Sequence, residues 1–307
     1  MSGKIHKKFA VIVTYFPDIN RLSRIVEILA ESKLHVVIVD NTGSNLECGF
    51  QYFSLFHNVI LFRSKSNRGI AAAQNFGIKF SLRHNADIIL FFDQDSFIDQ
   101  VFLAALLEPL KYDEVSVTSP SIVDLNSGFK YPLFNINALG LVKKSYDFSK
   151  SPMKVSIAIS SGMVVRSSVF SQVGLFDEDY FIDYVDTDFC LKCRASSIDI
   201  YVSPEAVMRH PISDKLTDYK FMRGFQYEGV RIYYQVRNSF LFFRKGYVPK
   251  LFAFREICSQ IIHFVVIGIL SRKPLLYYTT IFLGIKDGIL NVKGKVLKNK
   301  LNKIYGC

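Results

Sequence analysis

Short apolar runs alternate with amphipathic stretches through the first hundred residues. Four runs have the composition of buried strands: 9–14, 34–40, 58–62 and 87–93. Between them, apolar side chains at helical spacing predict helices over 19–32 and 69–83. This β-α-β-β-α-β order predicts an α/β fold, in which helices cover both faces of a mostly parallel sheet. Such sheets bind ligands beyond the carboxyl ends of their strands, so we look for the site among the polar residues there.

The pattern becomes less regular beyond residue 100. We expect a helix over 101–110, a strand over 115–120 and an irregular polar insertion over 124–155 near the site. A strand-like run follows over 155–165, and an acidic cluster leads into a helix within 180–196. Neither a GxGxxG segment nor a Walker phosphate loop follows the first strand. Dinucleotide or nucleotide binding of those two kinds is therefore not supported.

Two carboxylates one residue apart, Asp93 and Asp95, follow the strand-like run that ends at Phe92. Such a pair can share Mg²⁺ or Mn²⁺ with diphosphate oxygens, because hard cations prefer oxygen ligands. A solvated turn is the alternative interpretation. Asp40 ends another strand, and it is either a ligand of a base or ribose or a turn acid.

The segment from Asn67 to Asn75 places Arg68 directly before a helix of small residues. A helix N-terminus with a neighbouring Arg favours phosphate binding. In the alternative interpretation, Asn67 caps the helix and the small residues allow close packing on the sheet.

Six acidic residues fall within the twelve positions 177–188. Their mutual repulsion raises at least one carboxyl pKa or recruits a cation, unless the cluster is solvated. Apolar neighbours such as Phe181 and Phe189 argue against full solvation. Stabilisation of acids by a helix N-terminus is the alternative explanation.

Charge is divided unevenly along the 307 residues. Residues 1–210 hold 21 basic and 22 acidic side chains, whereas residues 211–307, the basic third, hold 17 and 5. The basic third is also rich in Phe, Tyr, Ile and Leu, which indicates an anionic partner such as a membrane or an anionic lipid-linked substrate. Nucleic acid is not the expected partner, because residues 1–210 are net acidic and lack a nucleic-acid-binding motif.

The cysteines indicate neither a metal finger nor an oxidised protein. Cys190 and Cys193 form a CxxC, but no second pair follows. The chain opens without a signal peptide, so we expect a reduced, cytosolic compartment.

The order of these motifs is more specific than any one of them. The chain reads VIVTYFP, VIVDNTGSN, NRGIAAAQNFGI, FFDQDS, SSGMVV, FDEDYFIDYVDTDFCLKCR, a His and YYQVRNSF. In this order the motifs resemble the family 2 inverting glycosyltransferases of the GT-A fold, over about residues 8–245. Within that family the chain is most similar to bacterial rhamnosyltransferases, which use dTDP-L-rhamnose to build O-antigen or other surface polysaccharides.

The resemblance implies a role for each matching residue. The donor nucleotide sugar would be bound by Thr14, Tyr15, Asp40, Asn67, Arg68, Gly69, Asn75, Asp93, Gln94, Arg237 and Asn238. Mg²⁺ or Mn²⁺ would be held by Asp93, Asp95 and His210. The acceptor or the site itself would be supported by Ser161, Gly162, Asp183 and Asp188. Taken alone, His210 is more often structural, and Arg237 in an aromatic helix is more often a packing residue.

The catalytic base of the family lies in an acidic motif that is usually Glu-Asp. Here Val185-Asp186 stands in its place, so Asp186 is the implied base and the preceding Glu is missing. Asp183, one helical turn earlier, is the candidate for the lost charge. The implied reaction is a single displacement with inversion, in which an ionised carboxylate of nearly normal pKa deprotonates the acceptor hydroxyl. Metal and basic groups would stabilise the departing nucleoside diphosphate.

The apolar stretches 252–270 and 275–290 are interrupted by charged and polar residues. The uninterrupted part, 261–270, is too short to span a bilayer, so we expect interfacial amphipathic helices that meet anionic headgroups. A pair of dimerisation helices is the alternative. We therefore divide the chain into a GT-A catalytic domain, 1–246, and a membrane-association or dimerisation segment, 247–307.

The family's acceptor is a saccharide linked to polyprenyl diphosphate. The resemblance thus implies a peripheral enzyme on the cytoplasmic face of the bacterial membrane. Two other functions stay open: a transferase of galactose, glucose or another sugar, and a non-catalytic membrane scaffold. The missing Glu before Asp186 favours the scaffold, and the intact Asp93–Asp95 pair opposes it.

Overall fold

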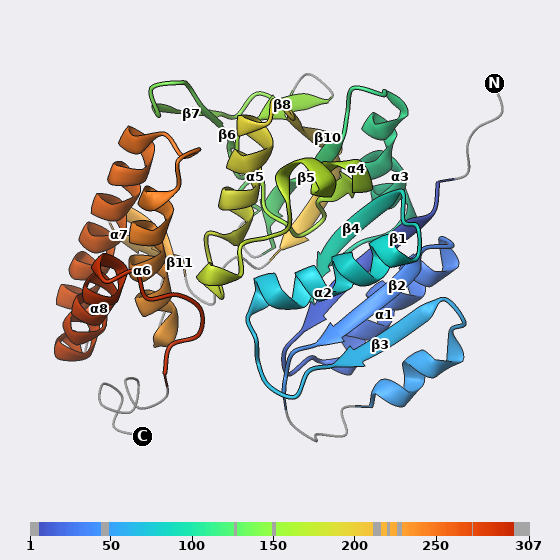
Figure 1. The fold of residues 1–307 in the computed structure, drawn as a ribbon, viewed down its shortest axis with the longest axis horizontal. Coiled ribbons are helices and arrows are strands. Elements are labelled where there is room, and N and C mark those ends of the chain that lie inside the picture. Colours follow the sequence, from blue (N-terminus) through green and yellow to red (C-terminus); the bar gives the residue numbers. More distant parts are fainter. Residues whose placement is uncertain are drawn as a thin grey trace.

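The computed structural model describes residues 6–43, 49–125, 128–148, 152–210, 216–219, 222–225, 229–271 and 273–297. An eight-stranded sheet lies at its centre, in the order β3-β2-β1-β4-β9-β5-β10-β8 (Figure 1). The parallel half consists of β1 (Lys8–Thr14), β2 (His35–Asp40), β3 (Val59–Arg63) and β4 (Ile88–Asp93). The mixed half consists of β5 (Val117–Asp124), β8 (Met153–Val155), β9 (Val164–Arg166) and β10 (Ile200–His210).

Two small antiparallel sheets lie outside the central one. They are formed by β6 (Leu133–Ile136) with β7 (Val142–Ser145), and by β11 (Leu216–Tyr219) with β12 (Met222–Phe225). The insertion expected to be irregular over 124–155 therefore contains three short strands.

Helices cover both faces of the central sheet, because successive strand side chains point in opposite directions. Phe9 and Val11 pack into the core that is shared with α2 (Ile70–Arg83), α4 (Ser167–Val173) and α5 (Val185–Ala195). Ala10 and Ile12 pack on the other face, under α1 (Ile19–Glu31) and α3 (Gln100–Leu107). Burial on both faces explains why these strands are apolar runs rather than alternating patterns. Short 3₁₀ turns complete this part: Phe50–Leu55, Glu108–Lys111 and Glu178–Tyr180.

The expected run of strand over 155–165 differs from the structure. Val155 ends β8, Ile157 forms an isolated bridge with Phe134, and the chain then turns at 160–162 before Val164–Arg166 pairs as β9. Gly162 has a φ of 77°, and its N–H donates to the Phe91 carbonyl at 2.7 Å. A side chain at Gly162 would lie 2.6 Å from Pro120, so a glycine is needed here to bring the turn against the sheet.

The last part of the chain forms three packed helices beside the sheet: α6 (Val230–Arg244), α7 (Lys250–Leu270) and α8 (Pro274–Ile289) (Figure 1). Their shared core contains Ile232, Val236, Phe264, Ile267, Tyr277 and Ile281. The domain boundary expected after residue 246 stays a prediction, although α6 precedes it and shares a core with the two helices that follow it.

Helix α7 is continuous over 21 residues, longer than the run 261–270 on which the sequence argument rested. By length and composition it is the one helix in the described residues that could cross a membrane, with a hydropathy of 1.6. It packs against α6 and α8, and 22% of its apolar window is buried. Length and composition alone do not decide whether it meets a membrane.

Candidate functional site

The carboxyl ends of β1, β2 and β4 bring several predicted residues to one edge of the sheet. Thr14 lies beside Asp40 in the β1–β2 register, and Val13 lies beside Asp93 in the β1–β4 register. This proximity of Thr14, Asp40 and Asp93 is what the order of strands predicted.

Asp40 stabilises this edge through hydrogen bonds to its neighbours. Its Oδ1 accepts from the Thr14 hydroxyl at 3.2 Å and from the Thr42 hydroxyl and N–H at 2.6 and 3.1 Å. Thr42 in turn accepts from the Phe16 N–H at 3.0 Å. Thr14 and Asp40 are buried, whereas Tyr15 is half exposed beside them. The buried pair therefore fixes the backbone from which Tyr15 projects.

Gln94 connects the Asp93–Asp95 turn to the end of β1. Its Oε1 accepts from the Tyr15 N–H at 2.7 Å, and its Nε2 donates to the Tyr15 carbonyl at 3.2 Å. Both polar ends of Gln94 thus hold the backbone of Tyr15, so Gln94 positions the turn relative to β1.

Ser161 supports the same turn from below. The Asp93 N–H donates to Ser96 Oγ at 3.1 Å, and Ser96 and Ser161 share a hydrogen bond of 3.1 Å. Ser161 also donates to the Met208 sulfur at 3.3 Å. Both serines are buried. Ser161 therefore stabilises the Asp93–Asp95 turn and offers no surface to an acceptor in this structure.

The Asp93–Asp95 turn fits a hard divalent cation by its chemistry, since it offers two half-buried carboxylates on one short loop. No group of three His, Cys, Asp or Glu side chains in the described residues forms a metal site by itself. His210, the predicted third ligand, ends β10 opposite Asp124 in the strand register, but its side chain lies outside the described part of the chain.

Asn41, which the sequence argument did not single out, organises the segment 67–70. Its Nδ2 donates to Asn67 Oδ1 at 3.0 Å and to the Gly69 carbonyl at 3.1 Å, and its Oδ1 accepts from the Arg68 N–H at 2.9 Å. Asn67 also accepts from the Gly69 N–H at 2.9 Å. Asn67 thus holds the turn before α2, whose N-cap residue Gly69 has no side-chain cap, and the Arg68 side chain is exposed.

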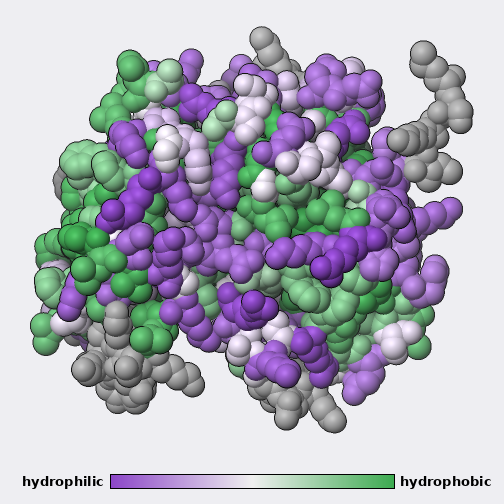
Figure 2. Space-filling view, viewed as in Figure 1, coloured by the Kyte–Doolittle hydropathy of each residue, from purple (hydrophilic) through white to green (hydrophobic). Residues whose placement is uncertain are grey.

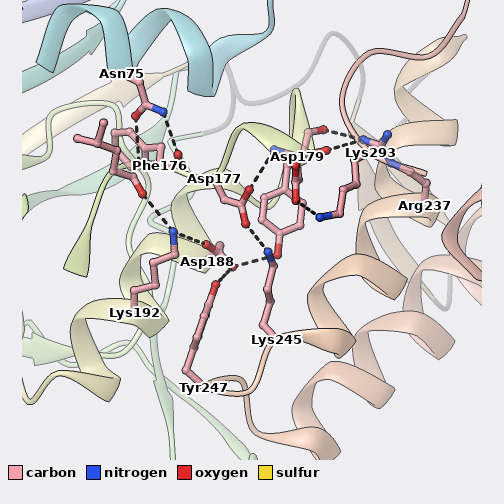
Figure 3. Close-up of polar contacts among 12 residues, drawn as sticks. Asn75, Phe176, Asp177, Asp179, Asp188, Lys192, Arg237, Lys245, Tyr247 and Lys293 are labelled. Atoms are coloured by element: carbon pink, nitrogen blue, oxygen red, sulfur yellow. Dashed lines mark hydrogen bonds and ion pairs between the residues drawn. The ribbon is translucent and has the colours of Figure 1, made fainter. Parts of the chain in front are cut away.

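The start of α2 packs directly on the acidic loop. The Ile70 N–H donates to the Phe181 carbonyl at 2.8 Å. A side chain at Gly69, whose φ is 87°, would lie 2.4 Å from the same carbonyl oxygen. Asn75 is buried and holds the neighbouring backbone, donating to the Phe176 carbonyl and accepting from the Phe176 N–H (Figure 3). Asn75 therefore positions this loop, and it does not reach a donor.

Basic side chains from the C-terminal third pair with three of the six acids in the cluster. Lys245 pairs with Asp177, and Lys293 pairs with Asp179 at 2.8 Å (Figure 3). Arg231 binds Asp183 through two nitrogens, at distances between 2.9 and 3.2 Å. Burial raises the pKa of Asp177, but the hydrogen bonds from Lys245 and a backbone N–H outweigh it and hold that pKa below its usual value.

Asp188 was expected to support the site, and the structure turns it away from Asp186. Two residues apart on α5, the two side chains point in nearly opposite directions. Asp188 is fully buried, accepts from the Tyr180 and Tyr247 hydroxyls at 3.0 and 2.5 Å, and pairs with Lys192 at 3.3 Å (Figure 3). Its role is to connect α5 to the loop and to the end of α6.

Arg237 and Asn238 were expected to contact donor phosphates, but both are fully buried in α6 and contact backbone instead. Arg237 donates to the carbonyls of Tyr180 at 2.8 Å and Gly294 at 2.7 Å. Asn238 Nδ2 donates to the carbonyls of Tyr180, Ile182 and Asp183, at 3.1, 2.7 and 3.3 Å. These two residues form a clamp that holds the acidic loop from behind.

The clamp is needed because the loop has an unfavourable backbone conformation. Phe181, Asp183 and Tyr184 have φ values of 67°, 61° and 64°, in the left-handed region that side-chain-bearing residues avoid. Each such residue costs on the order of 1–3 kcal/mol unless the surroundings stabilise it. Strain of this kind concentrates at functional sites, and here it directly precedes α5 and Asp186.

Asp186 lies in the first turn of α5, and Ser160 is its hydrogen-bond partner through both backbone and side chain. Burial raises the pKa of Asp186 to about 6. The Ser160 hydrogen bonds oppose this rise, and the charges of Asp93 and Asp183 add to it. Asp186 is thus electrostatically coupled to the Asp93–Asp95 turn and still largely ionised at pH 7. The buried amide of Gln74 donates to Ser160 at 3.3 Å, a contact to which no motif pointed.

Comparison with known proteins identifies the family. Residues 10–174 match the sequence model described as Glycosyl transferase family 2. The chain is 37% identical over 288 residues to the dTDP-rhamnosyl transferase RfbF of Shigella flexneri, covering 93% of this chain and 96% of that protein. The chain belongs to glycosyltransferase family 2. This family 2 glycosyltransferase is also 24% identical over 269 residues to the low-salt glycan biosynthesis hexosyltransferase Agl10 of Haloferax volcanii, covering 84% of each.

Solved structures agree on the fold. GalNAc-T7, determined with UDP, GalNAc and Mn²⁺, matches 89% of this glycosyltransferase with a TM-score of 0.58 and 16% identity. The chain spans only 59% of that protein. S. aureus TarS residues 1–349, determined with UDP-GlcNAc, match 93% of the chain with a TM-score of 0.57 and 16% identity. At these identities the likeness concerns the fold alone, and it confirms the expected GT-A architecture.

The clamp generates a testable prediction. We expect Asn238→Leu to leave the carbonyls of Tyr180, Ile182 and Asp183 without their donor, and to lower the free energy of unfolding by about 1–3 kcal/mol. Hydrogen–deuterium exchange should become faster at residues 179–188, because the strained loop loses its support.

Asn58→Leu is the matched control, since Asn58 Nδ2 also donates to two carbonyls, those of Ala30 and Leu34, on the far side of α1. The control should lose stability without a local increase in exchange at 179–188. Equal hydrogen–deuterium exchange at residues 179–188 in the two variants would contradict the role of Asn238 in holding the loop.

Proposed function

We propose that this protein transfers L-rhamnose from dTDP-L-rhamnose to a hydroxyl group of a saccharide acceptor, with inversion. The observation that carries the proposal is the 37% identity to a dTDP-rhamnosyl transferase across almost the full length of both chains. The intact Asp93–Asp95 turn and the half-buried Asp186 beside it support catalysis rather than a scaffold role.

The donor would lie over the ends of β1, β2 and β4, where exposed Tyr15 and Arg68 surround the edge that Asp40 makes rigid. Asp93 and Asp95 would hold Mg²⁺ or Mn²⁺, which neutralises charge on a departing nucleoside diphosphate. The exposed guanidinium of Arg68 adds positive charge at the same edge.

Asp186 would act as the general base. Its carboxylate takes the proton of the acceptor hydroxyl while that oxygen forms the new bond to the anomeric carbon. The bond from the anomeric carbon to the diphosphate breaks on the opposite face, which inverts the configuration. Ser160 keeps the carboxylate oriented and ionised through its hydrogen bonds. Asp183 is paired with Arg231, so its charge is compensated and does not simply replace the missing Glu.

For Asp186→Asn we expect a folded protein that binds dTDP-L-rhamnose with unchanged affinity in calorimetry. Its rate of sugar transfer should be at least ~100-fold lower, because a positioned general base accelerates such a reaction by about 10²–10⁴-fold. Asp113→Asn, at an exposed position on another loop, is the control and should behave as wild type. Normal turnover by the Asp186 variant would remove it from the base role.

The pH profile of the same reaction gives a second readout. The active form is the ionised carboxylate, so kcat/KM should fall as the pH drops through about 6, the pKa of Asp186. Ser160→Ala removes a hydrogen bond to the ionised form, which raises that pKa and moves the acid limb to higher pH.

The metal and the donor can be tested together by thermal shift. We expect dTDP-L-rhamnose with Mg²⁺ or Mn²⁺ to raise Tm more than UDP-galactose or UDP-glucose does, and EDTA to reduce the shift. Asp95→Ala should lose the metal-dependent part of the shift, whereas Asp99→Ala, at the N-cap of α3, is the control. A shift from Asp95→Ala equal to that of wild type would exclude Asp95 as a ligand, and a larger shift from a UDP sugar would exclude rhamnose as the preferred donor.

We also propose that α7 and α8 dock the enzyme on an anionic membrane where a polyprenyl-diphosphate-linked acceptor resides. Figure 2 shows hydrophobic surface at the left, where Figure 1 places α7 and α8. The exposed apolar side chains that follow helical spacing on these two helices are Leu251, Phe254, Ile262, Ile269, Leu275, Phe282 and Ile289. Exposed Lys250, Arg255 and Lys286 lie on the same helices. An apolar stripe with flanking cations is the pattern of an interfacial helix, and the same surface in a dimer is the alternative.

Vesicle co-sedimentation tests this docking on the full chain. Ile269→Asp with Phe282→Asp should abolish sedimentation with phosphatidylglycerol vesicles, because two charges enter the apolar stripe. Leu55→Asp with Leu139→Asp, equally exposed positions elsewhere, is the control. Unchanged sedimentation of the first variant would contradict membrane docking, and loss of a dimer in light scattering would favour the dimer instead.

A further inference from the structure

A cavity of about 450 Å³ lies between α7 and the loop that leads to Asp186. Asp183, Tyr184 and Thr187 form its wall on the side of α5, and Thr187 directly follows Asp186 in the chain. The residues at the donor edge of β1, β2 and β4 do not line it. The cavity is thus separate from the donor edge and lies beside the loop and the first turn of α5 that carry Asp186, although Asp186 itself is not among its lining residues.

The wall formed by α7 carries an unusual pattern. Its polar members are Arg255, Glu256, Ser259, Gln260 and His263. At 100° per residue these positions form a polar stripe on one side of the helix, together with the buried Phe252 and Ile267, whereas the exposed apolar side chains lie on the opposite side. Outside this stripe, α7 has only Lys250 and Cys258 among its polar side chains. Neither packing in the bundle nor contact with a membrane requires such a stripe, so it points to a ligand.

Glu256 is the clearest sign of an unfilled binding site. Its carboxylate is mostly buried, yet the contacts to the Tyr184 hydroxyl and to the Arg255 guanidinium are long, at 3.5 and 3.7 Å. Burial raises the pKa of Glu256, and these two neighbours only partly offset the rise. A hydroxyl group of a ligand would supply the short hydrogen bond that the carboxylate lacks.

The chemistry of the wall fits a sugar ring. Phe134, Tyr184 and Phe252 offer apolar surfaces for the C–H faces of a ring. Glu256, Gln260 and Gln235 offer donors and acceptors for its hydroxyl groups. A diphosphate fits less well, because the wall contains the mostly buried carboxylate of Glu256, and its one guanidinium, that of Arg255, already lies 3.7 Å from that carboxylate.

We propose that this cavity binds the terminal saccharide of the acceptor, and that Glu256 and Gln260 of α7 select its hydroxyl pattern. The inference rests on the proposed function. It assigns acceptor recognition to α7, for which the sequence analysis expected only membrane association or dimerisation. Helix α7 then has three uses: packing in the bundle, contact at the surface and recognition of the substrate.

The test uses the full-length protein and two octyl glycosides, octyl α-L-rhamnoside and octyl N-acetyl-β-D-glucosaminide, with saturation-transfer NMR for binding. We expect at least one glycoside to bind wild type. Glu256→Gln should weaken that binding about tenfold, as for the loss of one hydrogen bond to a charged group, and Gln260→Leu several-fold. The KM for that glycoside in the transfer assay should rise in parallel, without a change in dTDP affinity.

Glu114→Gln and Gln172→Leu, exposed and remote, are the matched controls and should bind both glycosides as wild type does. Normal dTDP-L-rhamnose binding in all variants shows that they are folded. If that donor binding holds but neither glycoside binds wild type, or the Glu256 and Gln260 variants bind as tightly as wild type, the cavity is not the acceptor site. If wild type fails to bind the donor while a glycoside still binds, the proposed function is wrong and the sugar site stands.

Discussion

The site depends on one constraint, the buried clamp of Arg237 and Asn238 on the strained loop before α5. Three residues of this loop have left-handed backbone angles. These angles raise the free energy of the folded loop, so contacts from elsewhere in the structure must stabilise it. The Arg237 and Asn238 side chains of α6 donate hydrogen bonds to carbonyl groups of the loop. A buried guanidinium is costly unless it is hydrogen-bonded, so Arg237 in turn depends on these carbonyls. The orientation of the first turn of α5, and therefore of Asp186, is set by the docking of a helix some fifty residues further along the chain.

The same dependence explains the uneven charge. Arg231, Lys245 and Lys293 come from the basic third and pair with Asp183, Asp177 and Asp179. The C-terminal helices are therefore not only a carrier for the catalytic domain, because they supply the counter-charges without which six clustered acids would repel one another. The pair between Lys293 and Asp179 is partly exposed and contributes little by itself, whereas the pair between Lys245 and Asp177 is better shielded from water. Part of the positive excess is thus used inside the fold, and exposed Lys250, Arg255 and Lys286 lie on α7 and α8.

Asp186 is coupled to the charge of Asp93, and its chain neighbours Tyr184 and Thr187 line the cavity beside α7. Asp93 belongs to the edge formed by β1, β2 and β4, with the Asp93–Asp95 turn fixed by Gln94, Ser96 and Ser161. The cavity is walled by the polar stripe of α7. A base that serves an inverting displacement must reach the incoming hydroxyl while the leaving group departs from the opposite face. Its raised pKa follows from this position, since it is removed from water and faces the negative charge of Asp93, and the Ser160 hydrogen bonds keep it ionised near neutral pH.

Hydrophobic periodicity predicted β1 to β4, a mostly parallel sheet and the polar residues at its carboxyl edge, because these follow from the period of side-chain direction along the chain. It did not predict the order of the strands in the sheet or the short strands within 124–155. The motif order pointed to Asp186 and the Asp93–Asp95 turn. Only the tertiary structure separated residues that face the site from residues that hold it. Asn75, Asp188, Arg237 and Asn238 belong to the second group, and Ser160, Asn41 and Thr42 had no signal of their own. Their partners are mostly backbone groups or side chains far away in sequence, and a hydrogen bond to a distant carbonyl leaves no periodic trace in the amino-acid sequence.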